Sequence, residues 1–255
     1  MVTIGPAIGR DKSPVRGHSL YTYHMQPLVS VVLPVLDEER TLARALGYLV
    51  DLPGRFEVIV VDGGSSDGTL ETARANAGAR VLTSPPAPPG RAAQLNAAAA
   101  LASGEVLLFL HADTVLPPDA FASLGRALRD PAVIGGNFAL RFDGGDRFSR
   151  FLGVLYAAMR HAGIYYGDSA VFVRDDTFRA LGGYRPLPIM DDYDFVRRLE
   201  RLGRTVCLPG PAVTSARRWK ALGIRRTLTS WVLVQGLFIA GVPASRLARL
   251  YRSAR

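Results

Sequence analysis

The chain has 255 residues, of which 48% are hydrophobic, and it contains one cysteine. This length and composition suit a single α/β domain and exclude both a second independent domain and an internal disulfide framework. Residues 1–26 are rich in Gly, Pro and basic side chains and lack an apolar signal core, so they predict a disordered leader on a cytoplasmic protein.

The formal net charge of +9 is concentrated at the C-terminal end. Residues 201–255 hold 11 of the 31 Lys and Arg and no Asp or Glu. The aromatic interleaving and motifs of nucleic-acid-binding modules are missing, which predicts that nucleic acid is not a partner. An anionic membrane surface or a diphosphate is the expected partner of this basic segment.

Apolar runs and helical patterns alternate along the first half of the chain. The expected elements are a strand at 29–34, a helix at 38–49, a strand at 56–61, a helix at 68–77, a short strand at 80–82, a helix at 91–102, a strand at 105–110 and a helix at 118–128. This alternation predicts a mostly parallel, doubly wound sheet.

The second half has a different pattern and is the expected acceptor region. It contains a predicted strand at 134–142, a helix at 147–161, a strand at 170–173 and a helix that begins in the acidic segment 191–194. The lone cysteine, Cys207, lies in a short apolar run and is predicted to be a buried hydrophobic residue.

The segment from Asp62 to Thr69, with the sequence Asp-Gly-Gly-Ser-Ser-Asp-Gly-Thr, directly follows the predicted strand 56–61. A buried strand that ends in a carboxylate, small residues and a helix start is typical of a nucleotide crevice in an open α/β sheet. The glycine spacing fits neither dinucleotide nor P-loop phosphate motifs, so Asp62 and Asp67 are expected to accept hydrogen bonds from a base or ribose. The alternative is a plain corner in which Asp67 or Thr69 caps the helix.

Two further predicted strands also deliver acidic residues at their carboxyl ends. Asp37-Glu38-Glu39 follows the first strand, and His111-Ala112-Asp113 follows the strand 105–110. Since carboxyl ends of parallel strands meet at one edge of a sheet, these acids are predicted to line a common crevice.

Together these segments resemble the family-2 glycosyltransferases of the GT-A fold, which transfer a sugar from a nucleotide diphosphate to an acceptor. The resemblance covers about Leu28 to Trp219 and includes Pro34–Glu39, Val60–Thr69, Gly90-Arg91 with Asn96, His111–Asp113, Gly182-Gly183-Tyr184, Asp191-Asp192 and Arg218-Trp219. It implies a catalytic domain at 27–220 with a single doubly wound, mostly parallel sheet flanked by helices. Residues 221–255 then form a basic amphipathic C-terminal helical segment.

The resemblance also implies which residues hold the nucleotide, and it implies a uridine-type nucleotide. The implied nucleotide-binding residues are Pro34, Val35, Glu39, Asp62, Asp67, Arg91, Asn96 and Ala112. Arg91 at a predicted helix start would meet a phosphate or the base edge, with an ordinary surface charge as the alternative.

A divalent cation, Mg²⁺ or Mn²⁺, is implied for the leaving diphosphate. Asp113 stands where such enzymes carry the last Asp of an Asp-x-Asp motif, whereas His111 replaces the first Asp. Both cations prefer oxygen ligands, so Asp113 is the expected metal ligand. His111 contacts a phosphate or is a hydrogen-bonded structural histidine.

The catalytic base is expected in the acidic segment 191–194. Asp191 as N-cap with Asp194 three residues later resembles a capping box, which leaves Asp192 without a structural role. The acidic pair of the family aligns its second member with Asp192, so Asp192 is the expected base and Asp191 the alternative.

The remaining site residues are expected to contact the diphosphate or the acceptor: His111, Asp168, Gly183, Arg217, Arg218 and Trp219. The Arg-Trp pair is best known from processive relatives, which carry a Gln three residues before the Arg. Ser215 stands at that Gln position, which disfavours processive synthesis.

The sequence supports a metal-assisted, inverting transfer of sugar to an acceptor hydroxyl. The alternatives are a sugar nucleotidyltransferase and a non-catalytic nucleotide-sugar binding protein. The acceptor stays open, with a lipid or carotenoid-like molecule favoured by the C-terminal segment. Its apolar run 231–242 is too short to span a bilayer, so it is expected either to lie on an anionic membrane surface or to pack on the core.

Overall fold

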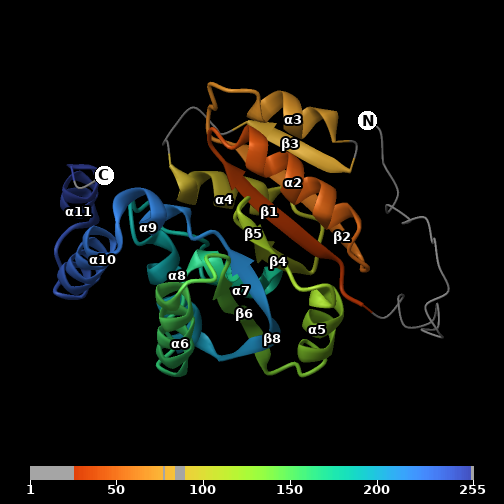
Figure 1. Cartoon of the computed structure of the whole chain (residues 1–255). Helices are drawn as coiled ribbons and strands as arrows, with labels where there is room; N and C mark the ends of the chain where they lie inside the picture. The colour runs from red at the N-terminus through yellow and green to blue at the C-terminus, as the bar shows by residue number, and fades with distance from the viewer. Residues whose placement is uncertain (1–25, 77, 84–89, 254–255) are drawn as a thin grey trace.

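The computed structural model describes residues 26–76, 78–83 and 90–253 (Figure 1). The predicted leader, apart from Gln26, and the Pro-rich segment 84–89 lie outside the described residues.

Parallel strands form the N-terminal half of the sheet. These strands are β1 (Val29–Val35), β2 (Phe56–Asp62), β3 (Ala79–Thr83) and β4 (Val106–Phe109), and β1 pairs with both β2 and β4. The connecting helices are α2 (Glu39–Val50), α3 (Thr69–Ala75) and α4 (Arg91–Ala100). Every strand and helix expected here is present, with boundaries that differ by at most three residues.

The second half adds antiparallel pairs to the sheet. Its strands are β5 (Thr114–Val115), β6 (Val133–Phe142), β7 (Val171–Arg174) and β8 (Arg204–Thr214). In the part of the chain described, the eight strands follow the order β3-β2-β1-β4-β7-β6-β8-β5, and β7 runs antiparallel to both β4 and β6. The accompanying helices are α5 (Ala120–Ala127), α6 (Arg147–His161), α7 (Asp175–Ala180) and α8 (Asp191–Leu202), with a 3₁₀ turn at Gly167–Ser169.

Alternate residues of the central strands point to opposite faces of the sheet, because the side-chain period of a strand is two. On β1, Val31 and Leu33 join the cluster formed with α2 and α5, whereas Val32 joins the cluster formed with α4 and α8. Burial of each such side chain stabilises the fold by about 1.5–3 kcal/mol. Both faces are therefore covered, and the carboxyl edge of β1, β2 and β4 remains for a site.

Three further helices follow the sheet: α9 (Arg217–Leu222), α10 (Ile224–Ile239) and α11 (Ala244–Ser253). They project from one side of the molecule (Figure 1), and Trp219 and Trp231 anchor them on α6 and β6 through an apolar cluster. Among the described residues no helix combines the length and the apolar character needed to cross a membrane.

One expectation from the apolar patterns is wrong. Cys207 is exposed on β8, because its neighbour Leu208 is buried and successive strand residues point to opposite faces of the sheet.

Candidate functional site

Asp62 closes the corner between β2 and α3. Its buried carboxylate accepts hydrogen bonds from the backbone N–H groups of Gly64 (3.0 Å) and Ser65 (3.1 Å). The carboxylate therefore shapes the loop that follows β2, and it lies beside Val35 because the two residues are in register across the β1–β2 pair.

The loops after β1 and β2 bind each other through short polar side chains. Asp37, which has a positive φ of 52°, accepts hydrogen bonds from the backbone N–H (2.8 Å) and hydroxyl (3.1 Å) of Ser66. The Asp37 N–H in turn donates to the Ser65 hydroxyl (2.9 Å). This reciprocal pairing holds the predicted nucleotide loops in one arrangement.

Asp67 lies at the start of α3 and is exposed. It accepts hydrogen bonds from the hydroxyl and N–H of Thr69, which lower the pKa of its carboxyl, and it also accepts from the Glu39 N–H (3.3 Å). Asp67 thus makes the hydrogen bonds expected if it only stabilises the start of α3. Its carboxylate is nevertheless exposed at the predicted nucleotide site.

Two amides on α4 reach neighbouring strands and loops. The buried amide of Gln94 donates to the carbonyl oxygens of Val35 (3.3 Å) and Val61 (3.1 Å), a role that was not predicted from the sequence. Its position three residues after Arg91, on the same helix face, was the available signal. Asn96 exchanges two hydrogen bonds with the Tyr184 backbone, which fixes the loop at Gly183.

Gly183 has a φ of 68°, and a Cβ added there would lie 2.6 Å from the Asn96 Oδ1 atom. The resemblance assigned nucleotide binding to Asn96 and acceptor or diphosphate contact to Gly183. In the structure Gly183 packs against the Asn96 side chain, on the same helix, α4, that carries Arg91. Pro34, Val35 and Ala112 lie at the ends of β1 and β4, at the same edge of the sheet.

Arg91 joins the two acidic residues of the predicted base segment. Its Nε and Nη2 atoms donate to the two carboxylate oxygens of Asp191 at 3.0 and 2.7 Å, and its Nη2 lies 3.2 Å from the Asp192 Oδ2. The Nη1 atom lies 3.2 Å from the His111 Nε2. Arg91, His111, Asp191 and Asp192 therefore form one cluster from α4, the end of β4 and the start of α8.

Asp192 also accepts hydrogen bonds from backbone N–H groups. The Gly167 N–H donates to Oδ2 (3.1 Å) and the Tyr193 N–H donates to Oδ1 (2.8 Å). Burial favours the neutral acid, but the charge of Arg91 and these N–H groups together hold the pKa of Asp192 below its ordinary value. Asp192 is ionised at neutral pH and can accept a proton.

The capping-box interpretation of residues 191–194 is wrong. α8 begins at Asp191, its N-cap is Met190 with a φ of 64°, and no side chain caps it. Asp194 instead pairs with Arg198 (2.8 Å) and Arg185 (3.1 Å). Asp191 is buried because Arg91 neutralises it, a partner that local spacing could not reveal.

Arg217 at the start of α9 lies between two acids of the nucleotide edge. It forms a two-pronged ion pair with Glu38, and its Nε lies 3.2 Å from the Asp113 Oδ2. Since a guanidinium cation already lies against Asp113, the carboxylate faces a position that suits positive charge. The described residues contain no group of three metal-ligating side chains, so a cation at Asp113 needs oxygens from a ligand such as a diphosphate.

The remaining predicted acceptor residues lie on the side of the site that faces α10. Asp168 belongs to the 3₁₀ turn, next to Gly167, and the hydroxyl of neighbouring Tyr166 donates to the Gln235 Oε1 (2.8 Å). Trp219 is only 5% exposed and packs edge-on against Phe142. Its ring face is covered by protein, and the side chain of Arg218 lies outside the described part of the structure.

These features define the class of protein. A mostly parallel sheet with acids at its carboxyl edge is the arrangement of the GT-A nucleotide-sugar transferases, and solved members of that class share the fold. A mannosyltransferase from Pyrobaculum calidifontis, in complex with GDP-Man and Mn²⁺, superimposes with a TM-score of 0.64 at 23% identity over 84% of this chain and 64% of that chain. Glucosyl-3-phosphoglycerate synthase from Mycobacterium tuberculosis, in complex with Mn²⁺, UDP and glucosyl-3-phosphoglycerate, gives 0.61 at 23% identity over 91% and 88%.

Residues 30–181 match the model of glycosyl transferase family 2, and the chain belongs to this family. An uncharacterized protein of Mycobacterium tuberculosis (strain CDC 1551 / Oshkosh) is 34% identical over 119 residues, which are 46% of this chain and 37% of that protein. Glucosyl-3-phosphoglycerate synthase of Mycolicibacterium paratuberculosis (strain ATCC BAA-968 / K-10) is 36% identical over 101 residues, 36% of this chain and 30% of the synthase. The matched region spans about a third of the length of these curated relatives. The predicted family and GT-A fold are confirmed.

Replacement of Arg91 by Met should destabilise the fold, because it leaves two carboxylates in the protein interior without their cation. We expect the free energy of unfolding to fall by about 3 kcal/mol at neutral pH. This value is at the low end for the loss of a buried ion pair, because a third of the Arg91 side chain is exposed. Burial already raises the pKa of Asp191 above its ordinary value with Arg91 present. Without the cation, the pKa of Asp191 rises further and that of Asp192 rises above its ordinary value, so the loss should shrink as the pH falls and the acids take up protons.

Urea denaturation of wild type and Arg91→Met at about pH 5 and about pH 7.5 measures this difference. Arg185→Met is the matched control, since Arg185 pairs with Asp194 at an exposed position and its loss should cost under about 1 kcal/mol. An equal, pH-independent loss for both variants would contradict the burial argument.

Proposed function

We propose that this protein transfers a sugar from a nucleotide-diphosphate sugar to an acceptor hydroxyl with inversion at the anomeric carbon. The observation that carries this proposal is the ionised Asp192 carboxylate, which contacts Arg91 at the start of α4, while Arg91 also contacts His111 after β4. Glycosyl transfer requires a base for the acceptor hydroxyl and positive charge that stabilises the leaving diphosphate.

Asp192 serves as the general base. The acceptor hydroxyl donates its proton to Asp192 while its oxygen attacks the anomeric carbon, and the bond from that carbon to the diphosphate oxygen breaks. The nucleoside diphosphate leaves with the bonding electron pair. A single displacement of this kind inverts the anomeric centre, and Asp192 acts as a proton acceptor throughout.

Arg91 links donor binding to the strength of this base. While its guanidinium contacts Asp192, the low pKa makes the carboxylate a weak proton acceptor. The donor diphosphate is a stronger anionic partner for Arg91, so the guanidinium leaves Asp192 when the donor binds. The pKa of Asp192 then rises, because its carboxylate has lost a neighbouring positive charge. Proton transfer is thereby favoured only when the donor is present.

On the donor side, Asp62, Asp67 and Glu39 bind the nucleoside, for which a uridine nucleotide is proposed. A divalent cation, Mg²⁺ or Mn²⁺, would be held by Asp113 together with diphosphate oxygens, and it would supply positive charge that stabilises the leaving diphosphate. Arg217 would then leave Asp113 and contact the diphosphate. Because more than half of the Arg217 side chain is exposed, this movement needs little repacking.

A panel of nucleotide sugars tests the reaction class. Phosphorus NMR of a turnover mixture should show a nucleoside diphosphate, since the broken bond lies between the sugar and its phosphate. A sugar nucleotidyltransferase would instead release pyrophosphate from a nucleoside triphosphate. Pyrophosphate formed from UTP and a sugar phosphate would overturn the proposal.

Replacement of Asp192 by Asn should lower transfer by roughly 10² to 10⁴-fold with little change in donor affinity, because the shape is kept and the base is lost. Steady-state kinetics together with donor titration measure the two effects separately. Asp194→Asn, on the same turn of α8, is the control and should retain most activity. Activity lost in Asp191→Asn but kept in Asp192→Asn would move the base to Asp191.

Replacement of Asp113 by Ala should weaken cation-dependent binding of the nucleoside diphosphate, because the carboxylate ligand is removed. Titration calorimetry of UDP with Mn²⁺ and with chelator gives the cation-dependent part of the affinity. Asp119→Ala, whose acid pairs with Arg126 on α5, is the control. Equal UDP affinity with and without chelator in the wild type would refute the cation proposal.

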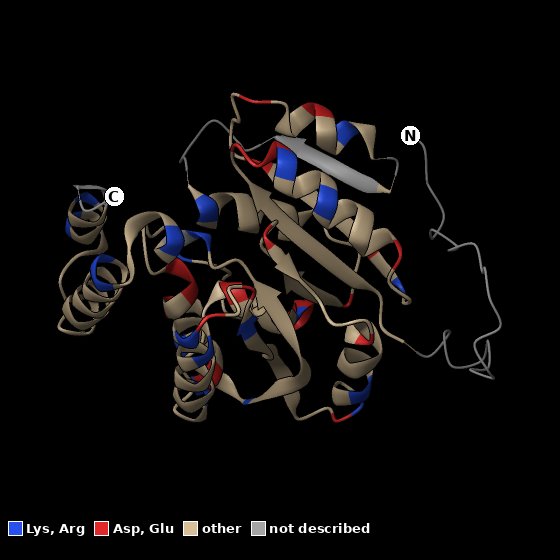
Figure 2. Ribbon diagram, in the orientation of Figure 1, with Lys and Arg blue, Asp and Glu red and all other residues tan. Residues whose placement is uncertain are grey.

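We further propose that α10 and α11 dock on an anionic membrane surface and thereby give access to an apolar acceptor. Val232, Leu233 and Ile239 of α10 are 71%, 52% and 64% exposed, so these apolar side chains are available to lipid. Basic residues accompany them on both helices (Figure 2), and residues 201–255 contain no acidic residue. Each Arg near an anionic surface contributes about 1 kcal/mol.

Liposome flotation at graded anionic lipid content tests the surface proposal. Reversal of Arg246 and Arg249 to Glu should weaken binding by more than about tenfold, since two attractive charges become repulsive. Reversal of Arg40 and Arg44, which are exposed on α2, is the matched control and should have little effect. A wild-type protein that stays unbound at every lipid composition and at low salt would refute membrane docking.

A further inference from the structure

Gln235 is a polar residue in an apolar part of α10. Residues 232–242 contain no other polar side chain. α10 follows the residues 30–181 that match the family model, so the family assignment gives Gln235 no role. The presence of an amide at this position therefore has to be explained from the contacts that it makes.

The side-chain oxygen of Gln235 binds Tyr166. The Tyr166 hydroxyl donates to the Gln235 Oε1 (2.8 Å). Burial, together with the charge of Asp192, raises the pKa of Tyr166, so the hydroxyl keeps its proton and remains a donor at neutral pH. The Gln235 Nε2 is buried and has no hydrogen-bond partner in the described part of the chain. An apolar side chain of similar size would avoid this unsatisfied N–H group, so the bond to Tyr166 is the advantage of the amide.

Tyr166 leads directly to a backbone group that binds Asp192. The N–H of the next residue, Gly167, donates to the Asp192 Oδ2 (3.1 Å). The Tyr166 carbonyl oxygen accepts hydrogen bonds from the N–H (3.1 Å) and the hydroxyl (2.6 Å) of Ser169, which close the turn. Ala170 ends this turn with a φ of 53°, a strained conformation that persists only where surrounding contacts hold it.

A second contact from α10 reaches the other side of the same carboxylate. Phe238, three residues after Gln235, packs edge-on against Tyr193 with ring centroids 5.9 Å apart. The Tyr193 N–H donates to the Asp192 Oδ1 (2.8 Å), and the Tyr193 ring stacks on that of Tyr166 at 6.2 Å. Each backbone N–H that binds Asp192 therefore belongs to, or directly follows, a tyrosine that contacts α10.

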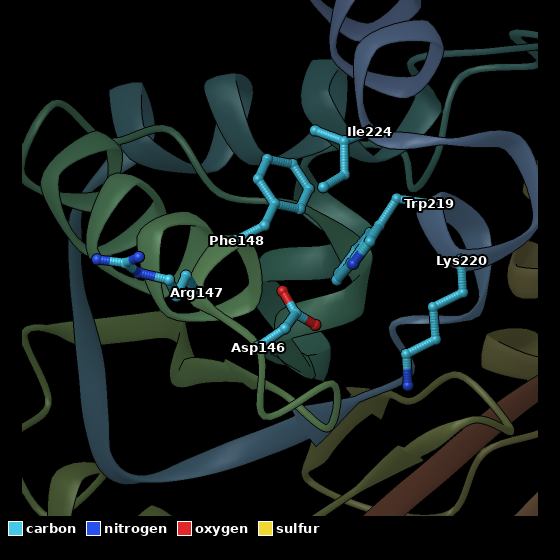
Figure 3. Close-up of a pocket in the computed structure, with 6 residues that line it drawn as sticks. All are labelled: Asp146, Arg147, Phe148, Trp219, Lys220 and Ile224. Carbon is cyan, nitrogen blue, oxygen red and sulfur yellow. The ribbon is translucent and has the colours of Figure 1, made fainter.

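α10 depends on such contacts for its position relative to the sheet. Its main helical neighbours are α9 and α11, which adjoin it in the chain. An open pocket of about 530 Å³ lies between the start of α10 and the start of α6, with Ile224 and Phe148 in its walls (Figure 3). Beyond the apolar cluster at Trp231, Gln235 and Phe238 connect the second half of α10 to the catalytic cluster.

We propose that Gln235 is a positioning residue for the general base. Through Tyr166 it holds the turn 166–170, and this turn keeps the Gly167 N–H on the Asp192 carboxylate. The catalytic consequence rests on the glycosyltransferase function proposed above. The hydrogen-bonded connection itself is measured without turnover.

Hydrogen exchange of the Gly167 amide tests the connection in the ligand-free protein. The dipeptide Tyr-Gly occurs once in the sequence, so isotope labelling of the Tyr carbonyl carbon and the Gly nitrogen selects this amide by NMR. In Gln235→Leu the exchange should be roughly three- to tenfold faster at neutral pH, which is the effect of losing one hydrogen bond. Tyr166→Phe should give a similar factor, and the double variant no further increase, because both changes remove the same bond.

Ser230→Ala is the matched control on α10. The Ser230 hydroxyl donates to the Thr227 carbonyl oxygen of the same helix, so its loss should leave the Gly167 exchange rate unchanged. A wild-type exchange rate in Gln235→Leu, or additive effects in the double variant, would overturn the connection. An equal acceleration at core amides such as that of Leu33 would indicate general destabilisation and would overturn it too.

Turnover kinetics test the catalytic consequence. In Gln235→Leu, kcat should fall by about three- to tenfold with an unchanged KM for the donor, because the contact acts on the base. The acid limb of the pH profile should move to higher pH, since a weaker hydrogen bond from Gly167 raises the pKa of Asp192. The variant leaves in place the other groups that act on this carboxylate: Arg91, His111, Asp191, Tyr166 and Tyr193.

The two proposals fail separately. An unchanged kcat and pH profile in Gln235→Leu, despite faster exchange at Gly167, would overturn the positioning role alone. Faster exchange at Gly167 in a protein that transfers no sugar from any nucleotide sugar would overturn the enzymatic function while the connection stands.

Discussion

The shared guanidinium of Arg91 is the interaction on which the site depends. Asp191 and Asp192 can both be ionised next to each other in the interior only because one cation lies against both. The same cation brings α4 to α8, elements that are 100 residues apart in the chain. His111 and Gly167 complete the cluster, and a Cβ on Gly167 would lie 3.0 Å from the His111 Nε2, so a larger residue there would crowd the imidazole.

Arg217 provides a second, looser connection of the same kind. It ties α9 to Glu38 in the loop after β1 and to Asp113 after β4. Both arginines are neutralised by acids of the protein in a position where a nucleotide diphosphate would supply anionic oxygens. Under the proposed function, donor binding at this edge would exchange the partners of these two arginines, which avoids the electrostatic cost of unpaired charge in the free protein.

Local patterns were sufficient to predict most of the strands and helices, because buried strands and amphipathic helices leave a periodic signature in the sequence. The two-residue strand β5 and the full length of β8 were not predicted. The edge of the sheet could also be predicted, since the acids at 37, 62 and 113 follow their strands directly. The antiparallel entry of β7 between β4 and β6 could not, because strand order is a long-range property. The partners of Asp191 and Asp113 escaped prediction for the same reason: Arg91 and Arg217 are each about 100 residues away in the chain.

The C-terminal helices connect the site to the surface of the molecule. Gln235 on α10 accepts a hydrogen bond from Tyr166, and Tyr166 immediately precedes the Gly167 whose N–H binds Asp192. Phe238, one turn further along α10, packs edge-on against Tyr193, the residue after Asp192. α10 therefore touches both backbone segments that orient the carboxylate. Under the proposed function, a shift of α10 is therefore expected to change the position of the base, Asp192, through these two contacts.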